Sequence, residues 1–400
     1  MNIKERFLKY VSFDTTSDEN STTVPTTAKQ KLLGQFLADE LKAIGLQDAH
    51  MDEFGYVYGY LPATPDRESD DALGLIAHMD TAPAVSGTDI KPSVINYAGG
   101  DIELGNGVSI TEKNFPFLKN YVGQDLIVTD GTTLLGADDK AGVAEIFTAC
   151  EYLLAHPEIS HRGIAVCITP DEEVGSGADH FDLSKFHAKK AYTVDGGELG
   201  EIEYENFNAA GAKIFVNGVN IHPGSAKNQM KNAVLMATQL ISMLPPAETP
   251  AHTEGYEGFY HVGDISGNET LVTMGMIIRD HDKEKFEARK AFLTNLVAYL
   301  NTVWGEGSFI LEMRDSYYNM KEQILPHMDL ITNAENAMRA VGAEPKIIAI
   351  RGGTDGARLS YMGLPCPNLS TGGANFHSVH EFISVQAMEK MVQVLIELVK

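Results

Sequence analysis

The chain has 400 residues, a hydrophobic fraction of 44% and a formal net charge of −24. This composition fits a globular protein with a large core. The acidity argues against a nucleic-acid partner, because binding a polyanion needs a basic face. No apolar run is long enough to cross a bilayer, and the N-terminus lacks the apolar core of a signal peptide, so we expect a cytoplasmic protein without membrane attachment. The 3 cysteines are scattered, which argues against a disulfide framework and a thiolate metal site.

The first 200 residues alternate between helical and strand patterns. Apolar residues at helical spacing predict helices, and short apolar runs bounded by turn residues predict strands. Strands are predicted at 54–63, 72–79, 125–130, 133–138, 163–173 and 189–198, and helices at 30–44 and 140–155. This alternation predicts an α/β domain with a mixed, mainly parallel sheet flanked by helices.

The pattern changes between residues 208 and 316. Its elements follow the order βαββαβ, with strands at 212–219, 258–262, 269–278 and 308–315 and helices at 229–244 and 282–304. This order resembles a ferredoxin-like unit. Helices at 326–343, 354–363 and from 385 onward, with a strand at 345–350, then resume the alternation. We therefore predict one discontinuous domain of residues 1–207 and 317–400, with residues 208–316 inserted as a smaller α+β domain.

His78 and Asp80 stand at the end of the strand predicted at 72–79. Residues two apart in a strand project to the same face, so this pair shares one site at the strand's carboxyl end, where open α/β sheets bind ligands. A metal-binding imidazole commonly donates its other N–H to a carboxylate. Taken alone, the motif is explained equally well by a structural His–Asp pair.

Carboxylates also follow other strands. Asp138 and Asp139 lie between a strand and a helix, where capping the helix is an alternative role. Glu172 and Glu173 follow the next strand in an acidic run that a solvated loop would also tolerate, and Asp195 precedes two glycines at the end of another. Because adjacent side chains diverge, one of the two glutamates can bind a metal while the other moves a proton.

The Gly-rich segment before the last helix carries His377 and His380. In a mainly parallel sheet the strand ends gather at one edge, so histidines and several carboxylates would converge there. Such a concentration of like charge indicates cations, and imidazole with carboxylate suits Zn²⁺, Mn²⁺ or Co²⁺. The motifs GxSxG, GxxxxGK[ST] and HExxH are absent, which leaves metal-dependent chemistry as the best supported class.

Five segments occur in the order AHMDTAP, LLGADDKAG, TPDEEVG, YTVDGG and HSVHEF. Together they resemble the dinuclear zinc exopeptidases, the family that includes glutamate carboxypeptidase, acetylornithine deacetylase and succinyl-diaminopimelate desuccinylase. TEGYEGFYH, DSYYNM, IRGGTDGA and MGLPCPNL resemble its tripeptide aminopeptidases in particular. The resemblance covers essentially the whole chain. It implies a zinc-exopeptidase catalytic domain, an inserted lid and dimerisation domain, a homodimer joined through the insert, and two divalent metal ions per subunit, zinc first and cobalt or manganese as alternatives.

The family pattern also implies the metal ligands. His78 and Asp195 would bind the first metal, and Glu173 and His377 the second. Asp138 would bridge both metals.

Two further expectations come from the same pattern. The Asp138–Asp139 peptide bond is expected to be cis, which is costly for a residue other than proline. His377 is preferred to His380 as the ligand because the family places this histidine four residues before a glutamate, here Glu381.

The remaining roles concern the reaction. Asp80 would orient His78, and Glu172 would be the general base that accepts a proton from the attacking water. The implied reaction releases the N-terminal residue of a tripeptide. The alternatives are another amidohydrolase of the family, such as a dipeptidase, carboxypeptidase or N-deacylase, and a non-catalytic scaffold with the same fold.

Residues of the insert would contact the substrate. His222 would polarise the scissile carbonyl, from the partner subunit of a dimer. Arg279 would hold the substrate's C-terminal carboxylate, with Arg351 as a second candidate, because an arginine fork matches a carboxylate. Asn232 would also contact the substrate. The enzyme would then select peptides by their length, because the distance between the metal centre and Arg279 would be fixed.

Overall fold

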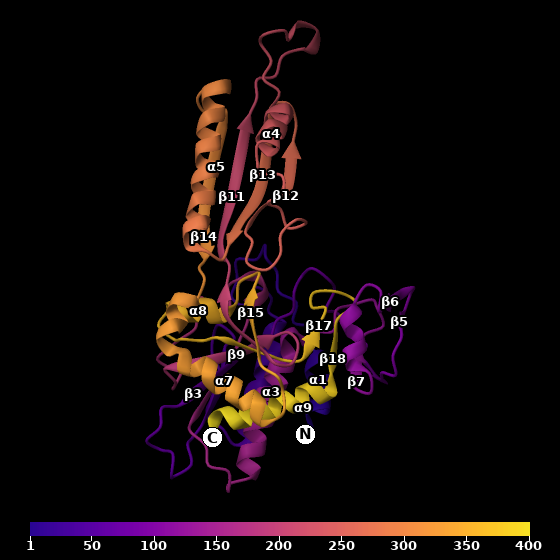
Figure 1. Ribbon diagram of the computed structural model, residues 1–400, viewed down its shortest axis with the longest axis vertical. Coiled ribbons are helices and arrows are strands. Elements are labelled where there is room, and N and C mark those ends of the chain that lie inside the picture. Colours follow the sequence, from indigo (N-terminus) through magenta and orange to yellow (C-terminus); the bar gives the residue numbers. More distant parts are fainter. The chain divides into compact units, whose positions relative to one another are not determined.

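A computed structural model describes residues 1–400. The chain divides into two compact units, drawn in Figure 1. Unit 1 comprises Met1–Tyr204, Glu322–Ile348 and Thr354–Lys400, and unit 2 comprises Glu205–Lys321 and Ala349–Gly353. None of the helices has both the length and the apolar character needed to span a membrane.

Unit 1 is built on an eight-stranded sheet in the order β1-β2-β8-β3-β9-β16-β10-β15. In that order the strands are Gln47–Met51, Val57–Leu61, Ile164–Thr169, Leu73–His78, Lys190–Gly196, Asn368–Ser370, Glu201–Asn206 and Lys346–Ile350. The central strands β8, β3, β9 and β16 run parallel, whereas β1, β2 and β10 pair antiparallel. The predicted α/β fold, a mixed sheet with a parallel centre, is confirmed.

Helices cover this sheet. α3 (Ala137–Ala155) packs on β3 and β9, and α1 (Ile3–Val11) and α9 (Val385–Val399) pack on α3. α7 (Met328–Ala340) packs on α9, and α2 (Gln30–Ile44) packs on β1 and β2. α8 (Asp355–Tyr361) packs on β9. α6 is a single turn, Lys321–Ile324. The predicted helix at 30–44 is α2, which buries Leu33, Leu37 and Leu41 at helical spacing and ends at Gly45 with a left-handed φ of 112°.

A second, small sheet in unit 1 has the order β17-β18-β7-β4 and lies beside a hairpin of β5 and β6. These strands are Gly373–Ala374, Phe382–Ser384, Asp125–Val128, Ser93–Asn96, Ile102–Gly105 and Val108–Ile110. Of these six strands, β7 is the only one that the sequence pattern predicts. The strand predicted at 133–138 is wrong: residues 133–136 form a loop and residues 137 and 138 begin α3. The N–H groups of Leu135, Gly136 and Ala137 donate to the side chain of Glu381 instead of a neighbouring strand.

Unit 2 contains the predicted βαββαβ order. Its elements are β11 (Asn208–Asn217), α4 (Ala233–Ser242), β12 (Phe259–Gly267), β13 (Leu271–Asp280), α5 (Lys283–Trp304) and β14 (Phe309–Tyr317). The sheet order β12-β13-β11-β14, with every pair antiparallel, is that of a ferredoxin-like unit. Alternate residues of β13 are buried against α4 and α5, among them Met274, Met276 and Ile278.

Candidate metal centre

The carboxyl ends of three parallel strands carry the predicted ligands to one edge of the main sheet. His78, the last residue of β3, is in register with Thr169, the last residue of β8. Glu172 and Glu173 follow in the turn after Pro170 and Asp171. Asp195 lies near the end of β9, which pairs with β3 on its other side. The parallel register therefore brings these residues together.

Asp138, at the start of α3, lies at the centre of the cluster. Its Oδ1 is 2.9 Å from Nε2 of His78, and its Oδ2 is 2.9 Å from Nε2 of His377. Each imidazole faces a second carboxylate. His78 Nε2 is 3.3 Å from Asp195 Oδ1, and His377 Nε2 is 2.9 Å from Glu173 Oε2. Asp138 thus belongs to two groups, each with one imidazole and two carboxylates. The first group is His78, Asp195 and Asp138, and the second is His377, Glu173 and Asp138.

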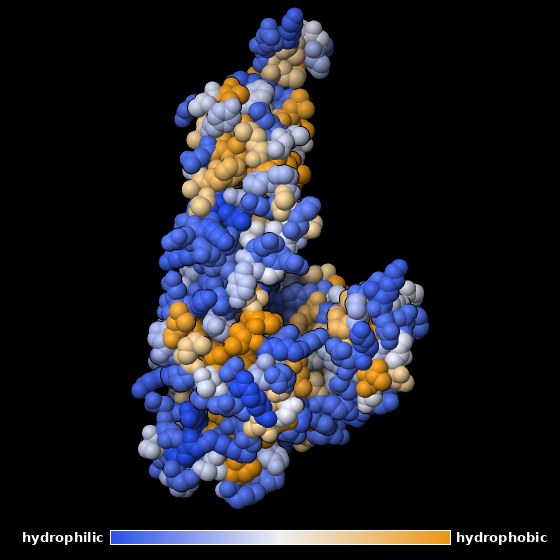
Figure 2. Space-filling model, viewed as in Figure 1, coloured by the Kyte–Doolittle hydropathy of each residue, from blue (hydrophilic) through white to orange (hydrophobic).

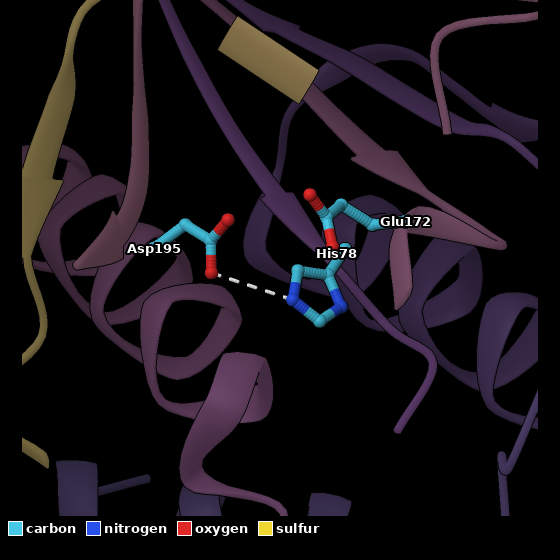
Figure 3. A group of neighbouring side chains, drawn as sticks. All are labelled: His78, Glu172 and Asp195. Carbon is cyan, nitrogen blue, oxygen red and sulfur yellow. Dashed lines mark ion pairs between the residues drawn. The ribbon is translucent and has the colours of Figure 1, made fainter. Parts of the chain in front are cut away.

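Figure 3 shows His78 and Asp195 of the first group together with Glu172. The carboxyl groups of Asp195 and Glu172 point toward the imidazole of His78 from different segments of the chain, and the dashed line marks the His78–Asp195 ion pair. One potential ligand atom from each of these three residues lies within 4.8 Å of the others, and the same holds for His78, Asp138 and Glu173.

These donors fit a pair of divalent metal ions. Atoms bound to the same tetrahedral zinc at ~2.0–2.1 Å lie roughly 3.3 Å apart, close to the separations around Asp138. Oε1 of Glu173 is buried without a hydrogen-bond partner, an arrangement that is costly unless a cation or donor satisfies the atom. Imidazole with carboxylate, without sulfur, is a donor set for Zn²⁺, Mn²⁺ or Co²⁺.

In the second group, the ionisable side chains shift one another's pKa values. Burial acts to raise the pKa of Asp138, but hydrogen bonds from His377 and His78 hold it well below its usual range. Contacts with Asp138 and Glu173 raise the pKa of His377 to about 11. Burial, together with the nearby Asp138, raises the pKa of Glu173 to about 8. Without metal, protons on the imidazoles supply the positive charge that this cluster of carboxylates requires.

The first group behaves in the same way. Burial lowers the pKa of His78, but Asp195 and Asp138 overcome this and raise it well above its usual value. Burial raises the pKa of Asp195 to about 6. Burial and the charge of Asp195 raise the pKa of Glu172 well above its usual value. Such displaced pKa values are typical of sites that bind cations or transfer protons.

Asp80 makes more contacts than its predicted role requires. It is fully buried, and its Oδ1 lies 3.3 Å from Nδ1 of His78. The same carboxylate accepts the backbone N–H groups of Glu172 at 3.0 Å and Glu173 at 3.2 Å. Asp80 therefore connects the imidazole of one strand end to the acidic turn of the next.

Two carboxylates that the sequence reasoning did not assign to the site hold its backbone. Asp139 accepts the N–H groups of His78 at 3.0 Å and Gly142 at 3.2 Å, and the Asp138–Asp139 peptide bond is cis, as expected. Glu381 accepts the N–H groups of four successive residues, from Leu135 to Asp138. Its place next to HSVH was the only sequence signal for Glu381.

The loop before β18 separates the two histidines predicted as alternatives. His377 has a left-handed φ of 59°, a costly conformation for a residue other than glycine, and its Nε2 faces Asp138. The ring of His380 instead lies against Phe115, with the ring centres 5.4 Å apart.

The remaining predicted residues belong to unit 2. His222 and Asn232 line the same open depression of about 740 Å³, and Asn232 also caps α4 by accepting the N–H of Val234. Nη1 of Arg279 donates to two main-chain oxygens, and its guanidinium lies over a tyrosine ring. Arg351 donates through Nη1 and Nη2 to the segment 253–257.

Comparisons with known proteins agree with this geometry. The model of peptidase family M20/M25/M40 matches residues 134–400. A protein named peptidase T from Caldanaerobacter subterraneus is 54% identical over 401 residues, which cover 100% of this chain and 98% of the relative. A tripeptidase structure from Staphylococcus aureus has a TM-score of 0.79 at 22% identity, covering 100% of this chain and 97% of its own. A dinuclear metal-binding peptidase of family M20 from Bacillus subtilis has a TM-score of 0.66 at 12% identity, covering 99% and 96%.

The chain therefore belongs to peptidase family M20/M25/M40. Within that family its full-length similarity is to proteins named peptidase T, which confirms the resemblance drawn from the sequence motifs. The two structural matches, at lower identity, support the shared fold.

Proposed function

We propose that this chain is a metal-dependent aminopeptidase that removes the N-terminal residue from tripeptides. His78, Asp195 and Asp138 would hold one divalent metal ion, and His377, Glu173 and Asp138 a second. The observation that carries the proposal is the placement of an imidazole at each oxygen of Asp138, with a further carboxylate beside each imidazole. Zinc is our first choice, with cobalt or manganese as alternatives.

The chain's own residues supply the proton transfer. When bound, the metal ions polarise the scissile carbonyl and make the attacking water more acidic. Glu172 accepts the proton of that water and passes it to the leaving amine. Asp80 fixes the position of this base by accepting the N–H of Glu172.

Residues of unit 2 complete the proposal. We assign His222, from the partner subunit, to the carbonyl oxygen of the substrate, and Arg279 to its C-terminal carboxylate. Arg279 is favoured because its protein hydrogen bonds come from Nη1, which leaves the rest of the fork for a ligand. Arg351 is a weaker candidate because both Nη1 and Nη2 already donate to the segment 253–257. Asn232 is also weaker, because its side-chain oxygen caps α4.

A homodimer joined through unit 2 is also part of the proposal. Apolar side chains on α4 and α5 support it, since Leu235, Tyr299 and Val303 are 66%, 53% and 50% exposed. Figure 2 shows apolar residues gathered over this part of unit 2. Exposed apolar patches commonly mark an interface.

We also propose that the protein is cytoplasmic. Its three free, buried cysteines fit a reducing compartment.

The proposed function is tested with a set of related peptides. Hydrolysis of unblocked di-, tri- and tetrapeptides is compared with that of an N-acetylated tripeptide, with and without a chelator. We expect rapid cleavage of the unblocked tripeptide alone, loss of activity with the chelator, and recovery on adding Zn²⁺, Co²⁺ or Mn²⁺. Equal cleavage of the N-acetylated peptide would contradict an aminopeptidase and favour a deacylase or carboxypeptidase.

A further inference from the structure

Glu381 has an unusual set of partners for a single side chain. Its carboxylate is 1% exposed and touches four consecutive backbone N–H groups. Oε2 accepts from Leu135 at 2.7 Å and Gly136 at 3.0 Å, and Oε1 accepts from Ala137 at 2.7 Å and Asp138 at 3.2 Å. The last of these residues carries the carboxylate shared by both imidazoles.

The backbone conformation explains how one carboxylate reaches four donors. Gly136 has a left-handed φ of 76°, which glycine adopts without steric cost. A left-handed residue next to right-handed ones turns successive N–H groups toward a common point, forming a nest for an anion. Every contact at this nest is an N–H donor, so a charged carboxylate satisfies all four, whereas an amide at this position would oppose two of them with its own N–H groups.

Along the chain, Glu381 follows His377 by four residues. Hydrogen bonds close the short loop between them: the hydroxyl of Ser378 donates to the main-chain oxygen of Asn375 at 2.7 Å and accepts the N–H of His380 at 3.1 Å. The amide of Asn375 in turn donates to the main-chain oxygen of His380 at 3.1 Å. These hydrogen bonds fix the shape of the loop that carries His377, directly before Glu381.

We infer that Glu381 is a positioning residue that clamps Asp138 and His377 into the geometry of the second metal site. This inference rests on the proposed dinuclear function. The clamp joins the segment at the start of α3 to the loop before β18. Two of the three proposed ligands of the second metal, Asp138 and His377, lie on these segments. The first metal depends on it less, because His78 and Asp195 are held by β3 and β9 within the main sheet.

The two metal sites should therefore respond unequally when Glu381 changes. Loss of a residue that supports a metal ligand commonly weakens metal binding about 10–100-fold. We expect Glu381→Gln to raise the dissociation constant of the second metal by about this factor and that of the first metal much less. A general loosening of the protein would weaken both sites together.

The experiment titrates the metal-free full-length chain with Zn²⁺ against a chromophoric competitor. Co²⁺ titrations followed by visible absorption then report the geometry of each site. The variants are Glu381→Gln, Glu381→Asp, which keeps the charge but shortens the reach, and Glu145→Gln as the matched control. Glu145 is also fully buried on α3, and neither of its oxygens has a hydrogen-bond partner, so its variant should bind both metals as the parent does.

Each outcome decides the question. Selective weakening of the second site in both Glu381 variants, with an altered Co²⁺ spectrum, supports the clamp. Parental affinities in Glu381→Gln, or equal weakening of both sites, overturn it. Failure of both variants to fold also overturns it, because Glu381 would then serve the fold rather than the metal. If the parent itself binds no second metal, the proposed dinuclear function fails instead.

Discussion

Replacing Asp80 by asparagine would remove one negative charge beneath the metal centre while leaving the side-chain volume almost unchanged. The carboxylate accepts the N–H groups of Glu172 and Glu173 through its two oxygens and faces His78 at 3.3 Å. Asparagine keeps one acceptor oxygen, so one of the two N–H groups would face an amide donor. The variant should therefore misplace the general base, the neighbouring ligand, or both.

The magnitude follows from these contacts. A hydrogen bond to a charged group contributes about 1.5–3 kcal/mol, and about 1.4 kcal/mol corresponds to a factor of ten in rate. If the cost falls on the reaction, kcat/KM for an unblocked tripeptide should drop roughly 10- to 150-fold. The protein should remain folded, because the contacts involve one turn at the edge of the sheet and not its core.

The assay combines steady-state kinetics, metal analysis and thermal unfolding. Asp52→Asn is the control for loss of a buried carboxylate charge outside the site. One oxygen of Asp52, Oδ1, accepts the backbone N–H groups of Phe54 and Tyr56, both at 3.0 Å, in a turn between β1 and β2, and its other oxygen faces Lys185. We expect Asp52→Asn to lower stability while keeping kcat per folded molecule. If Asp80→Asn retains the control's kcat/KM and metal content, the positioning role of Asp80 is refuted.

Three further predictions test other parts of the site. Glu172→Gln should keep both metals by elemental analysis and lower kcat by about 10²–10⁴, the usual contribution of a general base, so a variant with parental kcat would rule this residue out as the base. Arg279→Lys should raise KM about tenfold or more through loss of the charged fork and should reduce the preference for a free over an amidated C-terminus; an unchanged preference would place the carboxylate elsewhere. Burial raises the pKa of Glu145 well above its usual value, so the folded chain keeps a proton that the unfolded chain releases above about pH 4.3. Stability should therefore fall as pH rises above about 5, and Glu145→Gln should remove this part of the pH dependence. If the difference in unfolding temperature between parent and variant is the same at about pH 5 and about pH 8, the reasoning is contradicted.

The residues at the ends of the parallel strands could be predicted because simple geometry governs them. A side-chain period of two places His78 and Asp80 on one face, and parallel pairing brings Asp195 to the same edge as His78. The fold of unit 2 was equally accessible, since its strands and helices are long and strongly periodic. Burial alternates residue by residue along β13 and follows helical spacing along α5.

The small sheet and the clamping carboxylates could not be predicted in this way. β4 has no buried residue and therefore no alternation, and β7 pairs with β18 from a segment far along the chain. Leu134 and Leu135 are buried as they would be in a strand, yet they lie in a loop. The N–H of Leu135 donates to Glu381, and that of Leu134 donates to the main-chain oxygen of Ser86. Asp139 and Glu381 act on backbone N–H groups, which every residue except proline carries, so no side-chain pattern identifies their partners.

Anchoring through backbone N–H groups has a consequence for sequence change. The donors at Leu135, Ala137, Glu172 and Glu173 would remain after nearly any substitution, whereas the acceptors are specific carboxylates. In a saturation scan for activity, the acceptor Glu381 should tolerate almost no replacement. Position 135, restricted only by packing, should accept several apolar side chains and fail with proline. Sequence drift in the loops around this metal centre is thus expected to be broad at donors whose side chains have no role in the site, such as Leu135, and narrow at the few carboxylates that accept their N–H groups.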